Sequence, residues 1–332
     1  MPPAQSENLP RVVITGALGF IGSCLVAALH RTGRYTLVLS DDFSASRKFA
    51  NLQGINDCVR IDRGDIAAWI SEQPSGSIQW VIHIGARTDT TEFDQSVFDT
   101  LNISATHAIW EACTAQGIPL IYASSAATYG DGAHGYTDDH AGIEVLRPLN
   151  PYGWSKQVVD QWVLKQTNTP PHWYGLKFFN VYGPNEYHKG RMASVIMHAY
   201  HQMRESGRVK LFRSHRPDFA DGYQLRDFIY VKDVIAVLEW LMQHTPTSGI
   251  YNLGTGKAES FYQLAASTAT AMQIPLQIDW IDIPADIRDT YQYFTEADMS
   301  KLRNAGYTQP FATLSEGAVD YVRHYLMTGS YY

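Results

Sequence analysis

Cysteine is scarce in this sequence, and its scarcity excludes one class of fold. The 332 residues include three cysteines, Cys24, Cys58 and Cys113, which are widely separated. An odd and sparse set argues against a disulfide framework and suits the reducing cytoplasm, where we expect the protein to work. The 12 histidines form no His-x-x-x-His pair and no His/Cys cluster. Because metal sites draw on such spacings, we expect no bound metal.

The sequence also lacks an excess of positive charge and any long apolar run. Lys and Arg total 26 against 33 Asp and Glu, a formal net charge of −7. This balance argues against nucleic acid as a partner. No apolar run approaches the roughly 20 residues that a membrane-spanning helix needs, so we expect no membrane partner. Residues 1–10 lack the charged and apolar parts of a signal peptide, and we expect a flexible tail there.

What the sequence does contain is a glycine-rich turn between a strand and a helix. Residues 11–15 form a short, β-branched apolar run typical of a strand buried on both faces. The segment GALGFIG follows at 16–22, and an amphipathic helical pattern runs from there to Gly33. Gly16 would allow a tight turn, Gly19 would let backbone amides approach a pyrophosphate, and Gly22 would let the helix pack close to the strand. This order predicts a dinucleotide-binding site.

Further apolar runs alternate with helical patterns along the chain. We expect strands at 35–39, 59–61, 80–84, 119–123, 174–178 and 226–231, and helices at about 96–116 and 233–243. Residues 185–225 look polar and irregular, with a long loop over 213–225. The alternation predicts parallel βαβ units, and therefore an α/β fold with a Rossmann-type doubly wound parallel sheet. Ligands of such sheets bind at the carboxyl ends of the strands.

Candidate cofactor-binding residues fall at these strand ends. Asp41 follows the glycines at the interval where an acidic residue binds the ribose 2′-hydroxyl of NAD. Arg47 and Lys48 follow closely and suit the 2′-phosphate of NADP instead, so the choice between the two cofactors stays open. The small residues Gly85 and Ala86 end another strand and leave room for the cofactor.

Tyr152 and Lys156 form a pair just inside a helical pattern. Spacing of four residues places both side chains on one helical face. A phenol titrates at about pH 10 and is a poor base at neutral pH, but a neighbouring ammonium favours its charged form. Such a tyrosine can take a proton from a sugar alcohol while a nicotinamide takes the hydride. Ser125 lies at the end of a predicted strand, at the same edge of the sheet.

These motifs resemble those of the extended short-chain dehydrogenase/reductase family, which includes the NAD-dependent epimerases and dehydratases. The resemblance covers about residues 11–325 and rests on TGALGFIG, on Ser125, Tyr152 and Lys156, and on RDFIYVKDV at 226–234. Within that family the chain is similar to the epimerases that act on an ADP-linked heptose. The shared segments are YASSAATYG (122–130), FNVYGPNEYHKGRMASV (179–195), NLGTGKAESF (252–261) and YQYFTEADM (291–299).

The resemblance implies an isomerase that inverts C6 of the heptose in ADP-D-glycero-D-manno-heptose through a 6-keto intermediate. Tightly bound NADP, with NAD as the alternative, would take the hydride and return it to the other face. Tyr152 would be one acid/base, Ser125 would bind the reacting hydroxyl, and Lys156 would hold the nicotinamide ribose and tune Tyr152. Lys189 would be a second acid/base on the opposite side of the substrate carbon.

The resemblance also extends the set of site residues. The expected cofactor-binding residues are Gly16, Leu18, Gly19, Phe20, Ile21, Gly22, Asp41, Asp42, Lys48, Asp65, Ile66, Gly85, Ala86, Asn102, Tyr152 and Lys156. The expected substrate-binding residues are Ser125, Asn180, Lys189, Arg191, His198, Phe212, Arg226 and Tyr291.

The chain departs from the family pattern at several positions, including Asp42 and Arg191, and two alternatives stay open. The charge of Asp42 opposes NADP, and Arg191 stands where serine is usual beside the substrate. Another nucleotide-sugar epimerase, such as a 4-epimerase, is the first alternative, and a non-catalytic cofactor-binding protein is the second. A dehydratase is disfavoured because Ala126 and Ala127 replace the Asp-Glu pair that elimination needs.

The expected domain organisation follows from these assignments. Residues 11–180 would form the NAD(P)-binding Rossmann domain, to which 226–253 return. Residues 181–225 and 254–332 would form a smaller substrate-binding lobe. The expected partner is a small-molecule nucleotide sugar, and the family precedent is a homo-oligomer.

Overall fold

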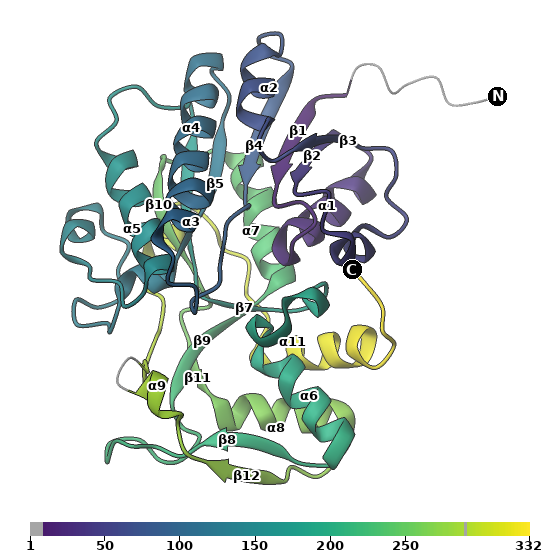
Figure 1. Cartoon of the computed structure of the whole chain (residues 1–332), viewed down its shortest axis with the longest axis vertical. Helices are drawn as coiled ribbons and strands as arrows, with labels where there is room; N and C mark the ends of the chain where they lie inside the picture. Colours follow the sequence, from purple (N-terminus) through teal and green to yellow (C-terminus); the bar gives the residue numbers. More distant parts are fainter. Residues whose placement is uncertain (1–8, 289–290) are drawn as a thin grey trace.

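A seven-stranded parallel sheet forms the upper part of the molecule in Figure 1, with a smaller lobe below it. The computed structural model describes residues 9–288 and 291–332. The strand order is β10-β6-β5-β4-β1-β2-β3, and the neighbouring strands are parallel. These strands are β1 (Arg11–Thr15), β2 (Thr36–Asp41), β3 (Val59–Asp62), β4 (Ile78–His83), β5 (Leu120–Ser125), β6 (Trp173–Phe178) and β10 (Gly249–Leu253).

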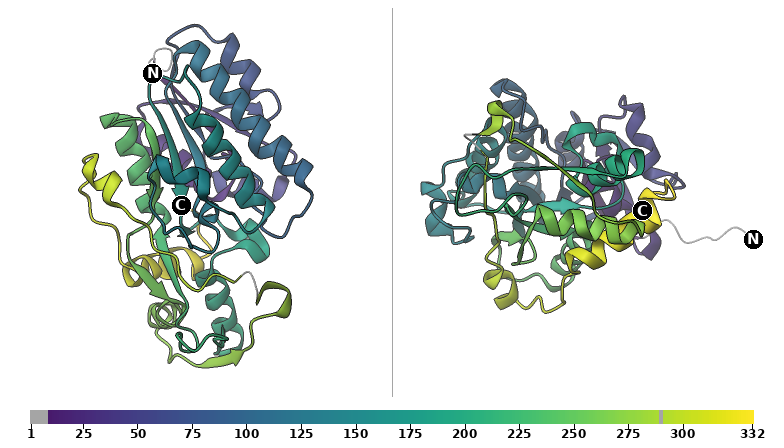
Figure 2. Two further views of the ribbon diagram at one scale, coloured as in Figure 1. Left: turned by 90° about the vertical axis from the view of Figure 1, so that its left-hand side faces the viewer. Right: turned by 90° about the horizontal axis from the view of Figure 1, so that it is seen from below.

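Helices cover both faces of the sheet, as the two turned views of Figure 2 also show. One face carries α1 (Phe20–Thr32) and α7 (Val231–His244), and the other carries α2 (Ile66–Glu72), α4 (Ala105–Gln116) and α5 (Pro151–Leu164). Along β1, Val12 and Ile14 pack into the hydrophobic core under α1 and α7, and Val13 packs into the core under α2, α4 and α5. Side chains that alternate between two buried faces explain why the strand is apolar throughout. The predicted Rossmann-type α/β fold is confirmed.

The described part of the smaller lobe contains two short sheets packed against helices, of which α6, α8 and α11 are the longest. One sheet has the order β11-β9-β7, and the other pairs β12 with β8. The strands are β7 (Asn180–Tyr182), β8 (Val209–Phe212), β9 (Leu225–Tyr230), β11 (Ala258–Ser260) and β12 (Ile278–Ile281). The helices are α6 (Val195–Ser206), α8 (Phe261–Met272) and α11 (Leu314–Tyr321). Of residues 226–253, α7 and β10 join the central layers, whereas β9 pairs with β7 and β11.

Residues 185–225 are not irregular throughout, contrary to the prediction. They contain α6 and β8, followed by a segment without helix or strand from 213 to 224. α6 begins at the N-cap Ser194 and ends at Gly207, which has a left-handed φ of 74°. Its buried face includes Ile196, Tyr200 and Met203, while its other face is polar. Because polar residues are interleaved with the apolar ones, the helical spacing of the apolar residues was not recognised in the sequence.

The expected helix over 96–116 is interrupted. The structure has α3 (Gln95–Phe98), a π-helical segment η2 (Asp99–Ser104) and then α4. A π-helical turn holds an extra residue, and such turns are frequent at functional sites. The predicted strands agree with the observed ones to within a few residues, and β2 extends to Asp41 itself.

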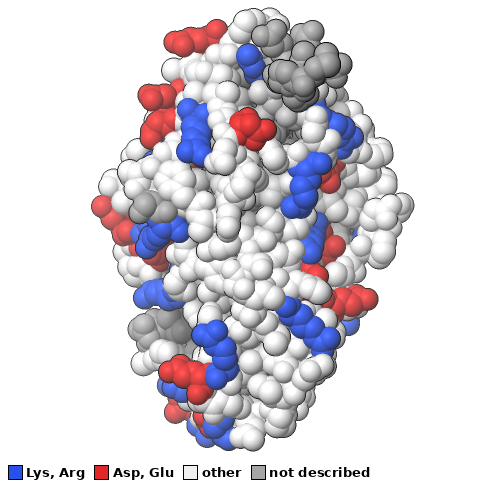
Figure 3. Space-filling view, turned by 90° about the vertical axis from the view of Figure 1, so that its right-hand side faces the viewer, with Lys and Arg blue, Asp and Glu red and all other residues white. Residues whose placement is uncertain are grey.

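The remaining elements are short. They are η1 (Ser46–Leu52), η3 (Ala126–Tyr129), η4 (His140–Val145), η5 (Tyr187–Met192), η6 (Val322–Leu326), α9 (Ala285–Arg288) and α10 (Ser300–Asn304). Within the described ranges, no helix has the length and apolar character needed to cross a membrane. The face shown in Figure 3 carries Lys and Arg interspersed with Asp and Glu.

Candidate active site

The glycine turn after β1 closes tightly against the end of β4. Gly16 has a φ of +65°, and a Cβ there would lie 2.7 Å from Gly85 Cα. A Cβ on Gly22 would lie 2.1 Å from the carbonyl oxygen of Gly16. The amide of Gly85 donates to Thr15 Oγ1 at 3.1 Å. A side chain at any of these three glycines would therefore push the turn, α1 and β4 apart.

The start of α1 is open to an anion. Its N-cap is Gly19, which supplies no side-chain hydrogen bond to the first-turn amides. These amides carry the positive end of the helix dipole, and a pyrophosphate satisfies them. The glycine cradle and the uncapped helix thus fit a dinucleotide. Leu18, Phe20 and Ile21, which the resemblance also assigns to the cofactor, lie in the same segment, at the turn and the start of α1.

Asp41 lies at the end of β2 and braces the glycine turn. Its Oδ2 accepts from the amide of Leu18 at 2.9 Å, and Lys48 Nζ lies 3.4 Å from its Oδ1. Asp42 accepts hydrogen bonds from the backbone and side chain of Ser44, and these bonds lower its pKa, as does Arg63 at 3.2 Å. Two carboxylates and two cations therefore lie together at the end of β2.

Ser125 and Tyr152 are brought together from β5 and α5. Asn150 caps α5 by accepting from the amide of Gly153 at 2.8 Å, and Pro151 follows at the first helical position. This start places Tyr152 in the first turn, facing the end of β5. Burial raises the pKa of Tyr152, and a hydrogen bond with Ser125 opposes that rise. The phenol is therefore protonated at neutral pH in the isolated chain.

Lys156 lies one turn further along α5 and is 3% exposed. Its Nζ donates to the carbonyl oxygen of Ala123 at 2.8 Å, which leaves two of its three N–H groups for other partners. Burial lowers the pKa of Lys156 to about 8, and the charge of Asp160 opposes this lowering. Lys156 is therefore mostly an ammonium at pH 7.

Lys189 approaches from the other side, on η5. Its Nζ lies 5.0 Å from the ring centroid of Phe20, the first residue of α1. The neighbouring His188 is tied to the same turn, because Asn51 Nδ2 contacts His188 Nδ1 at 3.1 Å and the carbonyl oxygen of Leu18 at 2.9 Å. Burial lowers the pKa of Lys189, and Glu186 opposes this lowering.

Lys189 approaches the site from a different strand end than Ser125 and Tyr152. Ser125 and Tyr152 lie together at the end of β5, whereas Lys189 lies at the turn after β1. β4 separates these two strands, so the strand ends are about 10 Å apart, which is two strand spacings. The segment that follows β4, which includes Gly85 and Ala86, leaves the sheet between these two strand ends.

The segment before Lys189 is held by the last part of the chain. Asn185 has a left-handed φ of 72°, is fully buried, and accepts from the amide of Tyr332 at 2.8 Å. Glu186 accepts from Tyr321 Oη at 2.9 Å. Tyr187 Oη donates to the carbonyl oxygen of Tyr325 at 2.9 Å. Three consecutive residues are thus anchored to residues 321–332.

Three of the expected substrate residues form one cluster in the smaller lobe. The guanidinium of Arg226 lies 5.3 Å from the ring centroid of Tyr291, and Phe212 packs edge-on against Tyr291 at 5.8 Å. Arg226 is 7% exposed and donates to the backbone of Leu225 and Gln292. An arginine framed by aromatic rings can bind a phosphate or stack on a planar group.

The other expected substrate residues lie apart from this cluster. Hydrogen bonds from Thr91 lower the pKa of Asp89, and the charge of Arg191 adds to this lowering. Arg191 therefore lies near the loop after β4. His198 Nε2 is 3.3 Å from the carbonyl oxygen of Arg191. Asn180 is exposed on β7.

Asn102 has a positioning role in the structure. Its side chain is fully buried, accepts from the amide of Arg87, and donates to the carbonyl oxygen of Arg87 and to Ser155 Oγ. Both of its amide hydrogens are used within the protein, so it holds the loop after β4 against α5. Of the expected cofactor-binding residues after β3, Asp65 is exposed and Ile66 is buried.

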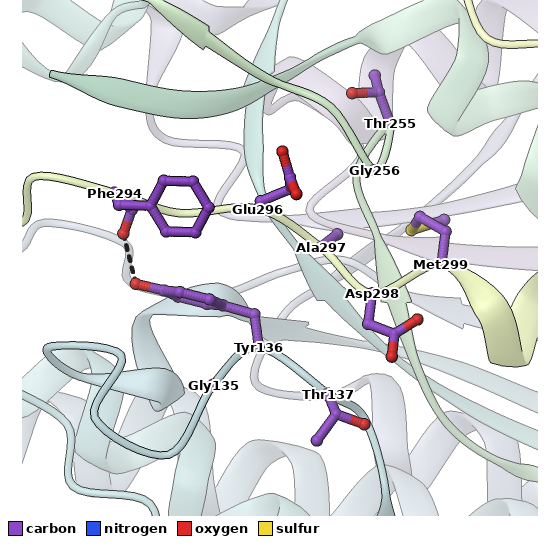
Figure 4. Close-up of a pocket in the computed structure, with 10 residues that line it drawn as sticks. All are labelled: Gly135, Tyr136, Thr137, Thr255, Gly256, Phe294, Glu296, Ala297, Asp298 and Met299. Atoms are coloured by element: carbon purple, nitrogen blue, oxygen red, sulfur yellow. Dashed lines mark hydrogen bonds between the residues drawn. The ribbon is translucent and has the colours of Figure 1, made fainter. Parts of the chain in front are cut away.

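A cavity of about 570 Å³, which no sequence pattern indicated, lies beside the smaller lobe (Figure 4). Its walls come from three loops, at 135–137, 255–256 and 294–299. Tyr136 closes one side by donating a hydrogen bond to the carbonyl oxygen of Phe294. None of its lining residues belongs to the expected site, which we assign from the strand ends instead.

Comparison with known proteins adds to this geometry. A family profile described as the NAD dependent epimerase/dehydratase family matches residues 12–254. An ADP-L-glycero-D-manno-heptose-6-epimerase from Fusobacterium nucleatum is 44% identical over 324 residues, covering 95% of this chain and 98% of that protein. The solved structure of a Helicobacter pylori ADP-L-glycero-D-manno-heptose-6-epimerase has a TM-score of 0.80 at 27% identity, covering 97% and 98% of the two chains.

A second solved structure is similar in fold. A UDP-N-acetylglucosamine 4-epimerase from Methanobrevibacter ruminantium gives a TM-score of 0.82 at 22% identity, covering 97% of this chain and 99% of that one. At this identity the similarity shows the shared architecture alone. The fold therefore does not separate a 6-epimerase from a 4-epimerase, and the sequence-level similarity does.

Proposed function

The chain belongs to the NAD dependent epimerase/dehydratase family, and from that membership we propose that it inverts C6 of the heptose in ADP-D-glycero-D-manno-heptose. The C6 hydrogen of this sugar has no adjacent carbonyl and is not acidic, so direct deprotonation cannot invert the centre. Oxidation of the C6 alcohol to a ketone, rotation, and hydride return to the other face inverts it with no net redox change. The nicotinamide cofactor supplies the hydride acceptor and donor.

The observation that carries the proposal is the placement of two proton-transfer groups on opposite sides of the end of β4. Tyr152 approaches from α5, and Lys189 approaches from η5 against Phe20. A 6-ketone that turns between two faces presents its oxygen in two directions, and each direction needs its own proton donor. One fixed tyrosine would serve only one of them.

We assign the remaining roles from the contacts of each residue. Ser125 holds the reacting oxygen beside Tyr152, because its hydroxyl is within hydrogen-bonding reach of the phenol. Lys156 favours the phenolate through its charge and offers two free N–H groups to the nicotinamide ribose. Arg226 and Tyr291 offer a cation and a ring to the ADP portion of the substrate.

Among nicotinamide cofactors we propose NADP, held at its 2′-phosphate by Lys48 with Arg63 nearby. The carboxylates of Asp41 and Asp42 favour the free 2′-hydroxyl of NAD instead. Releasing the cofactor from the purified protein and measuring its 2′-phosphate content decides between the two. Cofactor that lacks the 2′-phosphate would contradict the NADP assignment.

The substrate assignment has a direct test. The purified protein is incubated with ADP-D-glycero-D-manno-heptose, and the C6 epimers are resolved by chromatography. Interconversion of the two epimers supports the proposal, and no interconversion by cofactor-loaded protein contradicts it. A parallel incubation with UDP-glucose or UDP-N-acetylglucosamine tests the alternative of a 4-epimerase, which would interconvert the C4 epimers.

The proposal also retains the expected organisation of the molecule. The Rossmann domain holds the cofactor, the smaller lobe holds the nucleotide sugar, and the enzyme works in the cytoplasm as a homo-oligomer. Trp154, Leu149 and Val145 are large apolar residues exposed on or beside α5, which suits a surface that pairs with another copy. Light scattering coupled to size-exclusion chromatography measures the oligomeric state.

A further inference from the structure

A fully buried ion pair lies beneath the Ser125, Tyr152 and Lys156 set, and the mechanism above does not use it. Asp160 Oδ2 on α5 and Lys177 Nζ on β6 are 2.7 Å apart, and both side chains are 0% exposed. Two hydroxyl groups complete the surroundings of the carboxylate: Tyr122 Oη donates to its Oδ1 at 3.1 Å and Ser124 Oγ to its Oδ2 at 2.7 Å. Such a pair costs desolvation energy, so it is weak evidence for a purely stabilising role.

The pair is connected to both catalytic segments. Asp160 follows Lys156 by four residues and lies on the same face of α5. Its partners Tyr122 and Ser124 flank Ala123, whose carbonyl oxygen accepts from Lys156. On the other side, Lys177 donates to Thr128 Oγ1 at 2.7 Å, and Thr128 donates to the carbonyl oxygen of Ser125 at 2.8 Å.

Several groups that can carry charge face Lys156 from the surrounding elements. Asp160 on α5 and His83 on β4 interact electrostatically with Lys156. Tyr122 from β5 and Lys177 from β6 contact Asp160, the next polar residue along the same helical face. Burial lowers the pKa of His83 to about 3, so its ring is neutral. Burial and the charge of Asp160 raise the pKa of Tyr122, which stays a phenol. Asp160 is therefore the anion that acts on Lys156.

We propose that Asp160 and Lys177 are positioning residues for the redox step: Asp160 sets the charge balance at Lys156, and Lys177 offsets it while holding the end of β5 that carries Ser125. This inference rests on the proposed function, because it assigns these residues to the same reaction. It goes beyond that function in giving a catalytic reason for an ion pair that touches neither substrate nor cofactor.

The test is the pH dependence of kcat for C6 epimerisation in a pair of opposite variants of the cofactor-loaded enzyme. Asp160→Asn removes the negative charge that acts on Lys156, which lowers the pKa of Lys156 and moves the limb of the pH–rate profile that belongs to it to lower pH. Lys177→Met removes a positive charge and moves that limb to higher pH. Each displacement should be on the order of one pH unit, the effect of a unit charge several ångströms away at an effective dielectric constant of about 20.

The double variant Asp160→Asn/Lys177→Met keeps the proposal testable if a single variant fails to fold. It leaves no uncompensated charge in the core and should fold more readily than either single variant. Asp160 is the member of the pair that acts on Lys156. The pH–rate profile of the double variant should therefore lie between those of Asp160→Asn and wild type. Lys177→Arg, which keeps the charge, should restore the wild-type position.

Each outcome has a distinct meaning. Opposite displacements in the two single variants, with the double variant between Asp160→Asn and wild type, support the inference. Folded variants that lose activity with unmoved limbs would show that the pair is structural only, which overturns it. A wild-type enzyme that does not interconvert the epimers at any pH contradicts the proposed function, whatever the variants do.

Discussion

The two sides of the active site are built differently. On one side, Ser125, Tyr152 and Lys156 come from a central strand and a long helix. The buried Asp160–Lys177 ion pair lies below them. On the other side, Lys189 lies on a short 3-10 turn next to Gly190, which has a left-handed φ of 55° and no atom within 4 Å of its Cβ position. The redox side is fixed by the core of the fold, and the second proton-transfer side depends on a few anchors. The position of the second proton-transfer group can therefore change through the short segment that carries Lys189, while the redox groups on the sheet stay fixed.

The largest expected effects test whether the two sides divide the proton transfers between them. Tyr152→Phe removes the phenol hydroxyl without changing the ring, and we expect epimerisation to fall by about 10²–10⁴-fold. Its defect in the half-reaction, followed by reduced-nicotinamide absorbance in a single turnover, should be confined to one C6 epimer. Equal loss of cofactor reduction from both epimers would assign both proton transfers to Tyr152.

Lys189→Met is the matching change on the other side. The methionine keeps the apolar stem over Phe20 and removes the ammonium, so we expect a loss of about 10²–10⁴-fold in epimerisation. The half-reaction defect should appear with the epimer that Tyr152→Phe leaves able to reduce the cofactor. Near-normal turnover by this variant would remove Lys189 from the mechanism.

Glu186→Gln weakens the anchoring of the second side without touching Lys189. Glu186 raises the pKa of Lys189 against the effect of burial, so its loss should move the limb of the pH–rate profile that belongs to Lys189 to lower pH. The hydrogen bonds to Ser194 and Tyr321 also weaken, and we expect kcat to fall about tenfold, the worth of one charge-assisted bond.

Tyr321→Phe is the matched control for Glu186→Gln. It removes one hydrogen bond to Glu186 and keeps the carboxylate, so stability should fall while the limb stays in place. A limb that moves equally in both variants would mean that the Glu186 charge has no separate effect on Lys189.

The smallest effect concerns stability on the redox side. Lys156 has a folded-state pKa of about 8 against an ordinary value of 10.5, so the unfolded chain binds more protons between these values. Wild-type stability should therefore rise with pH across this window, and below pH 8 the buried ammonium costs roughly 3 kcal/mol. Lys156→Met should be more stable than wild type at pH 7, with an advantage that shrinks toward pH 10. Urea unfolding at pH 7 and 9.5 measures it, and a difference independent of pH would contradict the assignment.

The strand ends and the glycine turn could be predicted because their signals are local. β1 ends at Thr15 as predicted, and Gly33 terminates α1 with a φ of 62°. α6 was missed because its polar face carries His and Arg residues interleaved with the five buried apolar positions of the other face. For the Asp160–Lys177 pair, the sequence indicates only the position of Asp160, which follows Lys156 by the same four residues that separate Lys156 from Tyr152 and so lies on the same helical face. Its partner is 17 residues away and meets it only when β6 is seated beneath α5.

The position of Lys189 could not be predicted either, because it also depends on contacts between residues far apart in the sequence. The sequence marks it by its neighbours, but its distance from Tyr152 depends on how η5 leaves β7 and on the anchors from residues 321–332. Those anchors lie more than 130 residues away in the sequence. Local patterns carry no information about such a closure.

The π-helical segment at 99–104 has a consequence for how this chain tolerates changes in length. Its wider turn accommodates one residue more than an α-helix would. Loss of a single residue here would return the helix to regular winding and rotate everything before the deletion by about 100° relative to α4. The Asn102 amide would then face away from Arg87 and Ser155, which it now joins. The extra residue of the π-helical turn, and not the identity of one side chain, is therefore what aligns the loop after β4 with the helix that carries Tyr152.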